Sequence, residues 1–76
     1  MNTFWMDMRK FEIDADTITG GELKQLANSN PLNPVFQDMF RKGADVPIGD
    51  SEKISISGGI KHFYCVIPAT MRKGLP

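Results

Sequence analysis

The chain has one cysteine, Cys65, and one histidine, His62, residue types that often act as nucleophiles or metal ligands. Both lie in an apolar run near the C-terminus, and we interpret this run as a β-strand. A lone cysteine among apolar strand residues is usually a small buried hydrophobe, so we assign Cys65 no catalytic role. With no second histidine to suggest a metal site, we expect His62 to be solvated at a strand edge.

Two polar pairs precede the middle of the chain, and both have structural explanations. Thr19 lies three residues before Glu22, the spacing of a capping box in which the hydroxyl and the carboxylate satisfy free backbone N–H groups at a helix start. Asp14 and Asp16 lie in the turn before that helix, where carboxylates suit the backbone and the helix dipole. We therefore predict no catalytic site, no metal site and no cofactor, and we do not expect an enzyme.

Composition limits the class of protein further. The 76 residues form one domain, which hides only about 60% of its unfolded surface and has little core to support a deep catalytic cleft. Nine Lys+Arg balance nine Asp+Glu without clustering, which argues against nucleic-acid binding. The single cysteine allows no internal disulfide and fits a reducing cytoplasm. No apolar run reaches the roughly 20 residues of a membrane span, so we expect no membrane association.

The first half of the chain predicts a hairpin and then a helix. Apolar residues alternate with polar or outward-facing ones over residues 4–8 and again over 11–15, and Arg9-Lys10 between them predicts an antiparallel turn. The capping box, with Ile18 and Leu23 spaced as a hydrophobic staple, predicts a helix over residues 20–28. Pro31 ends this segment because it cannot continue a helical hydrogen-bond ladder.

The second half predicts three further strands, over residues 35–41, 53–57 and 62–67, the last closed by Pro68. One helix laid across a mixed sheet of four to five strands buries both apolar faces, and a single core requires the hairpin to lie beside the last strand. The prediction is an α+β fold of the β-grasp type over residues 1–68. Residues 69–76 are expected to form a flexible C-terminal tail.

The alternation within these strands also predicts an exposed apolar face. If Met39 faces the helix, Phe40 points to the open side of the sheet. The same parity turns Tyr64 and Val66 outward if Phe63, Cys65 and Ile67 are core, and it turns Trp5 outward between Phe4 and Met6. An exposed aromatic and aliphatic cluster is a candidate partner surface, with a register error or self-association as the alternative. Its members are Phe40, Val66, Tyr64 and Trp5.

The order of these pieces resembles the ubiquitin-like superfamily and, more narrowly, the bacterial multiubiquitin-type domains of ubiquitination-like operons. The matching segments are Thr17-Ile18-Thr19-Gly20-Gly21-Glu22-Leu23, Phe40-Arg41-Lys42-Gly43, Pro47-Ile48, Lys53-Ile54-Ser55-Ile56 and His62-Phe63 leading to Pro68. The resemblance implies a protein modifier. An adenylating enzyme would activate its C-terminal carboxylate, a conjugating enzyme would accept it as a thioester, and a target protein would receive it. The bacterial resemblance also suggests a role in antiphage defence.

The C-terminus departs from the paired glycine usual in this superfamily. Only Gly74 is present, preceded by Arg72-Lys73 and followed by Leu75-Pro76. Three interpretations remain open: a processing peptidase exposes Gly74, the tail is never processed, or the chain is cut from a longer one. Arg72 and Lys73 either lead Gly74 into an acidic groove of the activating enzyme or only keep the tail soluble.

Two other functions stay open beside the modifier. A sulfur carrier of cofactor biosynthesis has the same fold and also activates a terminal glycine. A ubiquitin-like module that only binds would show no reactivity at its C-terminus.

Overall fold

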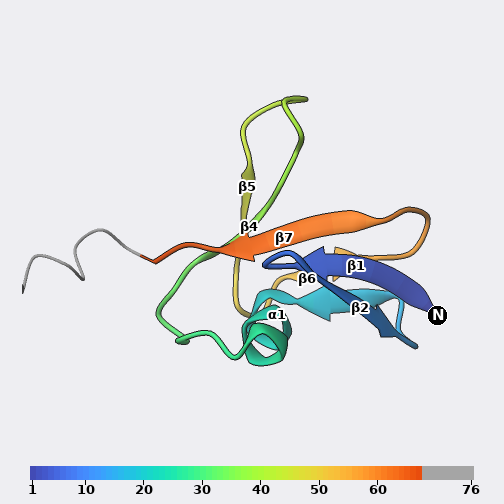
Figure 1. The fold of residues 1–76 in the computed structure, drawn as a ribbon, viewed down its shortest axis with the longest axis horizontal. Helices are drawn as coiled ribbons and strands as arrows, with labels where there is room; N and C mark the ends of the chain where they lie inside the picture. The colour runs from blue at the N-terminus through green and yellow to red at the C-terminus, as the bar shows by residue number, and fades with distance from the viewer. Residues whose placement is uncertain (68–76) are drawn as a thin grey trace, which may run out of the picture.

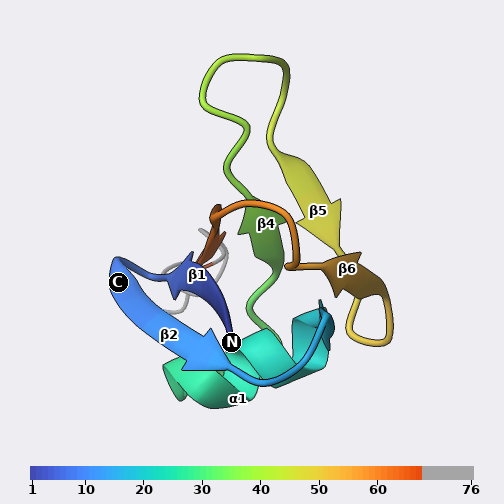
Figure 2. The same cartoon turned by 90° about the vertical axis from the view of Figure 1, so that its right-hand side faces the viewer.

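A computed structural model describes residues 1–67 of the chain (Figure 1). The described residues form a mixed five-stranded sheet of order β2-β1-β7-β4-β5, a two-stranded sheet β3-β6 and one helix, α1. This is the predicted α+β grasp arrangement, and Figure 2 shows α1 lying across one side of the sheet. No helix of residues 1–67 has the length and hydropathy needed to cross a bilayer.

The N-terminal hairpin is confirmed, but its turn lies two residues earlier than predicted. Strand β1 (Asn2–Met6) pairs antiparallel with β2 (Arg9–Ile13), so Arg9 and Lys10 belong to β2. The turn is Asp7-Met8, with φ angles of 51° and 66°, and Met8 is exposed. A two-residue hairpin turn with both φ angles positive matches the twist of the flanking strands, which the alternation of apolar residues does not reveal.

Helix α1 (Gly20–Ala27) begins at the predicted capping box. The Glu22 N–H donates to the Thr19 hydroxyl at 3.1 Å, and the Thr19 N–H donates to the Glu22 carboxylate at 2.9 Å. Ile18 and Leu23, the predicted staple, are both buried in the core. Asn28, predicted to be helical, is the C-cap in the left-handed region with φ 55°, so the helix is one residue shorter than expected.

We expect Thr19→Ala to lower the free energy of unfolding by about 1 kcal/mol, because the Glu22 N–H loses its acceptor. Urea denaturation followed by circular dichroism measures this change. Thr19→Ser keeps the hydroxyl and is the matched control. An unchanged midpoint for Thr19→Ala would contradict a stabilising role for the cap.

Strand β4 (Val35–Gln37) is four residues shorter than the predicted strand over residues 35–41. The Asp38 carboxylate accepts the Phe40 N–H at 2.8 Å, and Phe40 and Arg41 have φ angles of 50° and 71°. The strand has already ended at Gln37 and the left-handed residues form a turn beyond it, so the expectation that Met39 and Phe40 alternate across a sheet was wrong. The chain returns as β5 (Val46–Ile48), an edge strand that the sequence analysis missed.

The small second sheet was also absent from the sequence prediction. Strand β3 (Thr17–Thr19) pairs antiparallel with β6 (Lys53–Ser55), which ends two residues before the predicted boundary. The Ile56 N–H donates to the Asp16 carbonyl at 2.8 Å, and the Ile56 side chain is buried. This sheet carries Thr19, the N-cap residue of α1, so it helps to set the position of the helix.

Strand β7 (Lys61–Cys65) is the central strand, parallel to β1 and antiparallel to β4. The hairpin therefore lies beside the last strand, as the grasp fold requires. The strand ends at Cys65: the Val66 N–H still donates to the Pro34 carbonyl, but proline has no N–H to continue the ladder, and Ile67, predicted to be core, is exposed. The buried core consists of Phe4, Met6, Ile18, Leu23, Val35, Ile48, Ile56 and Phe63.

Candidate functional site

The face of the main sheet that is directed away from α1 carries several aromatic side chains. Buried Phe4 and Met6 on β1 leave Trp5 on the open face, and buried Phe63 on β7 leaves its two neighbours there. The cross-strand pairs on this face are Trp5 with His62 and Phe36 with Tyr64. Three strands thus contribute to one surface.

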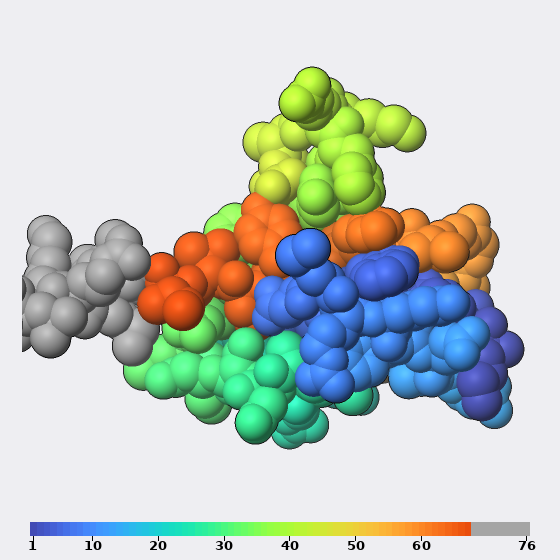
Figure 3. All heavy atoms as spheres, in the orientation of Figure 1, coloured from blue at the N-terminus to red at the C-terminus, as the bar shows by residue number. Residues whose placement is uncertain are grey.

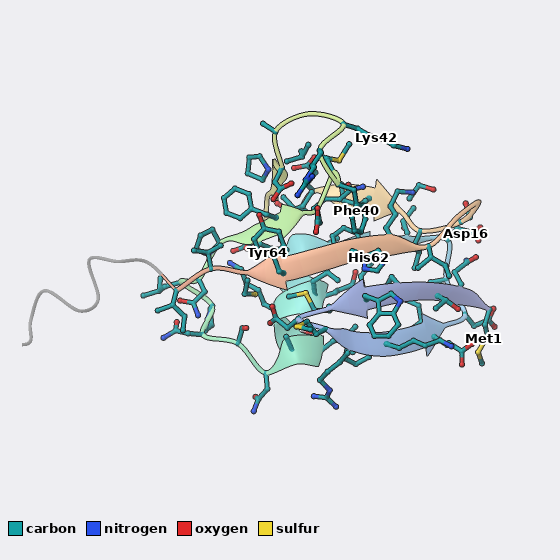
Figure 4. The ribbon with its side chains drawn as sticks, turned by 45° about the horizontal axis from the view of Figure 1, so that its top comes forward. Met1, Asp16, Phe40, Lys42, His62 and Tyr64 are labelled. Carbon is teal, nitrogen blue, oxygen red and sulfur yellow. The ribbon has the colours of Figure 1, made fainter. Side chains whose placement is uncertain are left out.

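The rings on this face make contacts within two groups. Trp5 and His62 stack with ring centroids 5.9 Å apart and an interplanar angle of 2°. Phe36 and Tyr64 stack at 5.8 Å and 17°. Phe40 meets the His62 ring edge-on at 4.8 Å, and Figure 4 shows Phe40 reaching from the 38–45 loop toward His62 and Tyr64 on β7.

The structure corrects the expectation for His62. We predicted a solvated histidine at a strand edge, but His62 lies on the central strand between β1 and β4. Its ring is partly buried between those of Trp5 and Phe40. The strand order, which depends on long-range pairing, decides this position. His62 therefore joins the aromatic face, which we define as Trp5, Phe36, Phe40, His62 and Tyr64.

The four residues predicted for the partner surface have different positions. Trp5 and Tyr64 lie on the sheet and are partly buried, whereas Phe40 is 57% exposed and reaches the face from a loop. Val66 lies past the end of β7, is 36% exposed, and is bonded through its N–H to Pro34. The structure therefore brings Trp5, Phe40 and Tyr64 around His62 and leaves Val66 beyond the aromatic face.

Asp45 ties the 38–45 loop to the sheet. Its carboxylate accepts the Tyr64 hydroxyl on one oxygen and the Met39 N–H, at 3.0 Å, on the other. The hydrogen bond to Asp45 raises the pKa of Tyr64 to about 12, and the same bond lowers the pKa of Asp45. The sequence gives no sign of the role of Asp45, because Asp45 and Tyr64 are 19 residues apart in the chain. In Figure 3 the loop stands out from the body of the protein.

Two shallow pockets flank the His62 side chain on this face. The larger, of about 360 Å³, is lined by residues that include Trp5, Asp7, Asp38, His62 and Tyr64. The smaller, of about 170 Å³, shares Asp38 and His62 and is also lined by Phe40, Lys42, Ile60 and Lys61. The face is thus hollowed where aromatic rings and charged side chains meet, a combination typical of protein recognition sites.

A third pocket, of about 380 Å³, lies at the helix and is explained by structural contacts. The largely buried Lys24 ammonium donates to the Pro31 carbonyl and to the Asp50 carboxylate, both at 2.7 Å. These bonds connect α1 to the segment that follows the helix and to the segment that follows β5. We interpret Lys24 as a structural residue.

Cys65, expected to be buried and inert, is partly buried at the end of β7. Burial raises the pKa of its thiol, which disfavours the thiolate that a nucleophile requires. Residues 1–67 contain no group of three or more side chains placed to hold a metal ion. Gly74, Arg72 and Lys73, predicted to form the reactive tail, lie outside the described residues.

Comparison with protein families gives one match. Residues 3–66 match the family model described as Multiubiquitin. The matched segment contains every described helix and strand except the first residue of β1. Searches of curated proteins and of solved structures find no match.

Proposed function

The chain belongs to the multiubiquitin family, and we propose that it is a bacterial ubiquitin-like modifier that is attached to target proteins through the Gly74 carboxylate. The family match over residues 3–66, together with the grasp fold, is the observation that supports this proposal. We place the pathway in the cytoplasm and, on the bacterial resemblance alone, in antiphage defence. The domain is the substrate of the conjugating reactions and catalyses none of them.

The proposed chemistry has three steps. The Gly74 carboxylate attacks the α-phosphorus of ATP in the activating enzyme, which forms an acyl-adenylate and releases pyrophosphate. A cysteine thiolate of the conjugating enzyme attacks the acyl carbon and releases AMP, which gives a thioester. An amine or hydroxyl of the target protein then displaces the thiolate, which forms an amide or ester bond.

We expect a chain ending at Gly74 to form a reductant-sensitive thioester and the same chain with Gly74→Ala to form less of it. A β-carbon at this residue would crowd the attacking thiol or hinder entry of the tail into a narrow groove, so we expect a loss of about tenfold. The measurement is incubation with ATP and the cognate activating and conjugating enzymes, followed by non-reducing gels and mass spectrometry.

The full-length chain is the control for processing. We expect it to form the thioester, a step called charging below, only after a peptidase removes Leu75-Pro76. If the chain ending in Pro76 charges equally well, processing is unnecessary and Gly74 loses its role. If no form charges, the chain is a binding-only module, and a thiocarboxylate at the terminus would identify a sulfur carrier.

We further propose that the aromatic face binds partner proteins of this pathway. One exposed and several partly buried aromatic rings beside shallow pockets support the proposal, because such anchors dominate protein interfaces. Phe40→Ala should weaken partner binding by about 1 kcal/mol or more, since Phe40 is the most exposed ring of the face. Its 57% exposure predicts little loss of fold stability.

Leu32→Ala is a matched control, because Leu32 is an exposed apolar residue on the connection after α1. Isothermal titration with the conjugating enzyme measures affinity, and urea denaturation measures stability. A large fall in stability for Phe40→Ala would show that Phe40 supports the fold. Equal binding by Phe40→Ala and the unmodified chain would show that partners bind elsewhere.

A further inference from the structure

The larger pocket of the aromatic face carries two carboxylates at the two sides of β7. Asp7 follows β1, and its N–H donates to the Phe63 carbonyl at 3.0 Å while its Oδ1 accepts the Cys65 N–H at 2.9 Å. Asp38 follows β4, and its N–H donates to the His62 carbonyl at 2.9 Å. These backbone bonds hold both aspartates beside the central strand, in the lining of the same pocket.

The charged side chains that line this pocket are all acidic. Its lining includes Asp7 and Asp38 but no lysine or arginine. Each aspartate uses Oδ1 to accept a backbone N–H, and within residues 1–67 neither Oδ2 accepts a hydrogen bond. Two carboxylate oxygens thus remain available to a donor. The smaller pocket shares Asp38 but is also lined by Lys42 and Lys61, so the two lysines outnumber its one carboxylate and the net charge changes sign between the two pockets.

The aromatic part of the pocket suits a flat cation. Trp5 and His62 are parallel within 2°, and Trp5 is the ring type that attracts cations most strongly. A guanidinium group is planar, stacks on aromatic faces and presents several N–H donors in fixed directions. An ammonium group is a compact point charge. It would bind the carboxylates, but it would stack on the planar rings less well than a guanidinium does.

We propose that the larger pocket binds an arginine side chain of a partner protein, with the guanidinium stacked on Trp5 and donating to Asp7 and Asp38. This inference rests on the proposed partner-binding role of the aromatic face and names the chemistry that the partner must present. Lys42 and Lys61 in the smaller pocket would repel a guanidinium, so the arginine is expected in the larger pocket. Figure 4 shows Lys42 at the far end of the 38–45 loop from His62.

The test uses the uniformly ¹⁵N-labelled chain and two small probes, acetyl-arginine methylamide and the uncharged analogue acetyl-citrulline methylamide. The single tryptophan gives one indole N–H signal that reports directly on the pocket. We expect the arginine probe to shift this signal and the backbone amides of Asp7, Asp38 and Tyr64. Its affinity should exceed that of the citrulline probe by at least about threefold, as expected for a charged group over an aromatic ring.

Asp7→Asn and Asp38→Asn keep an oxygen for the backbone bonds and remove the charge. We expect each to reduce arginine binding to the level of the citrulline probe. Asp14→Asn is the matched control, because Asp14 is exposed and outside the pocket. Equal binding of both probes, or arginine binding that is insensitive to Asp7→Asn and Asp38→Asn, would overturn the proposal.

A second copy of the chain is the competing occupant, because Arg72 also carries a guanidinium. If the pocket signals shift with protein concentration alone and Arg72→Gln removes this shift, the occupant is another copy and the partner assignment is wrong. Charging of Gly74 is measured separately. Normal charging without arginine binding would overturn the pocket assignment and leave the proposed modifier role intact.

Discussion

Gly20→Ala should destabilise the protein by about 3 kcal/mol, the largest effect on folding that we expect from a single methyl group. Gly20 is the first residue of α1, and an added Cβ would lie 2.4 Å from the Gly49 carbonyl oxygen and 3.0 Å from that of Ile48. These are backbone atoms, so no side-chain rotation relieves the clash. The adjacent Gly21 N–H donates to the Asp50 carbonyl at 2.9 Å, so moving the helix away would strain this bond as well.

Urea denaturation of Gly20→Ala and of the unmodified chain measures the difference. Gln25→Ala is the control, because Gln25 is an exposed residue of the same helix and alanine favours helices there. We expect that variant to change stability by less than about 0.5 kcal/mol. A Gly20→Ala protein as stable as the control would show that the start of α1 is not closely packed against the backbone at the end of β5.

Asp45→Asn should lower the pKa of Tyr64 from about 12 toward the ordinary tyrosine value of 10.0. The carboxylate of Asp45 accepts the phenol hydrogen, and its negative charge also opposes formation of the phenolate. An asparagine oxygen still accepts a hydrogen bond but carries no charge, so ionisation becomes easier. Tyr64 is the only tyrosine, so absorbance at the tyrosinate band follows this group alone.

The raised pKa also predicts how stability changes with pH. A group whose pKa is higher in the folded state stabilises the fold fully below its unfolded pKa and loses that effect as the pH rises through its folded pKa. The Tyr64 contribution should therefore fade between pH 10 and pH 12. Circular dichroism in the same titration shows whether the chain is still folded. Asp14→Asn is the control, and an equal pKa in Asp45→Asn would show that the loop does not bond to Tyr64.

Local features of the sequence determined the helix start and the inward and outward sides of most strands. The capping box needs only Thr19 and Glu22, three residues apart, so the sequence alone places it. The pleat alternates side chains with a period of two, so Phe4 and Met6 place Trp5 on the opposite face whatever strand lies beside it. The family resemblance likewise needed only the order of these local pieces.

The tertiary structure decided which residues share a site. Strands β3 and β5 are three residues each, too short for alternation to identify, and they exist because distant backbone groups pair. Phe40 reaches the aromatic face from a left-handed turn in the loop that follows β4. His62 and Trp5 meet because β7 lies parallel to β1, a pairing across more than fifty residues that local chain geometry cannot specify.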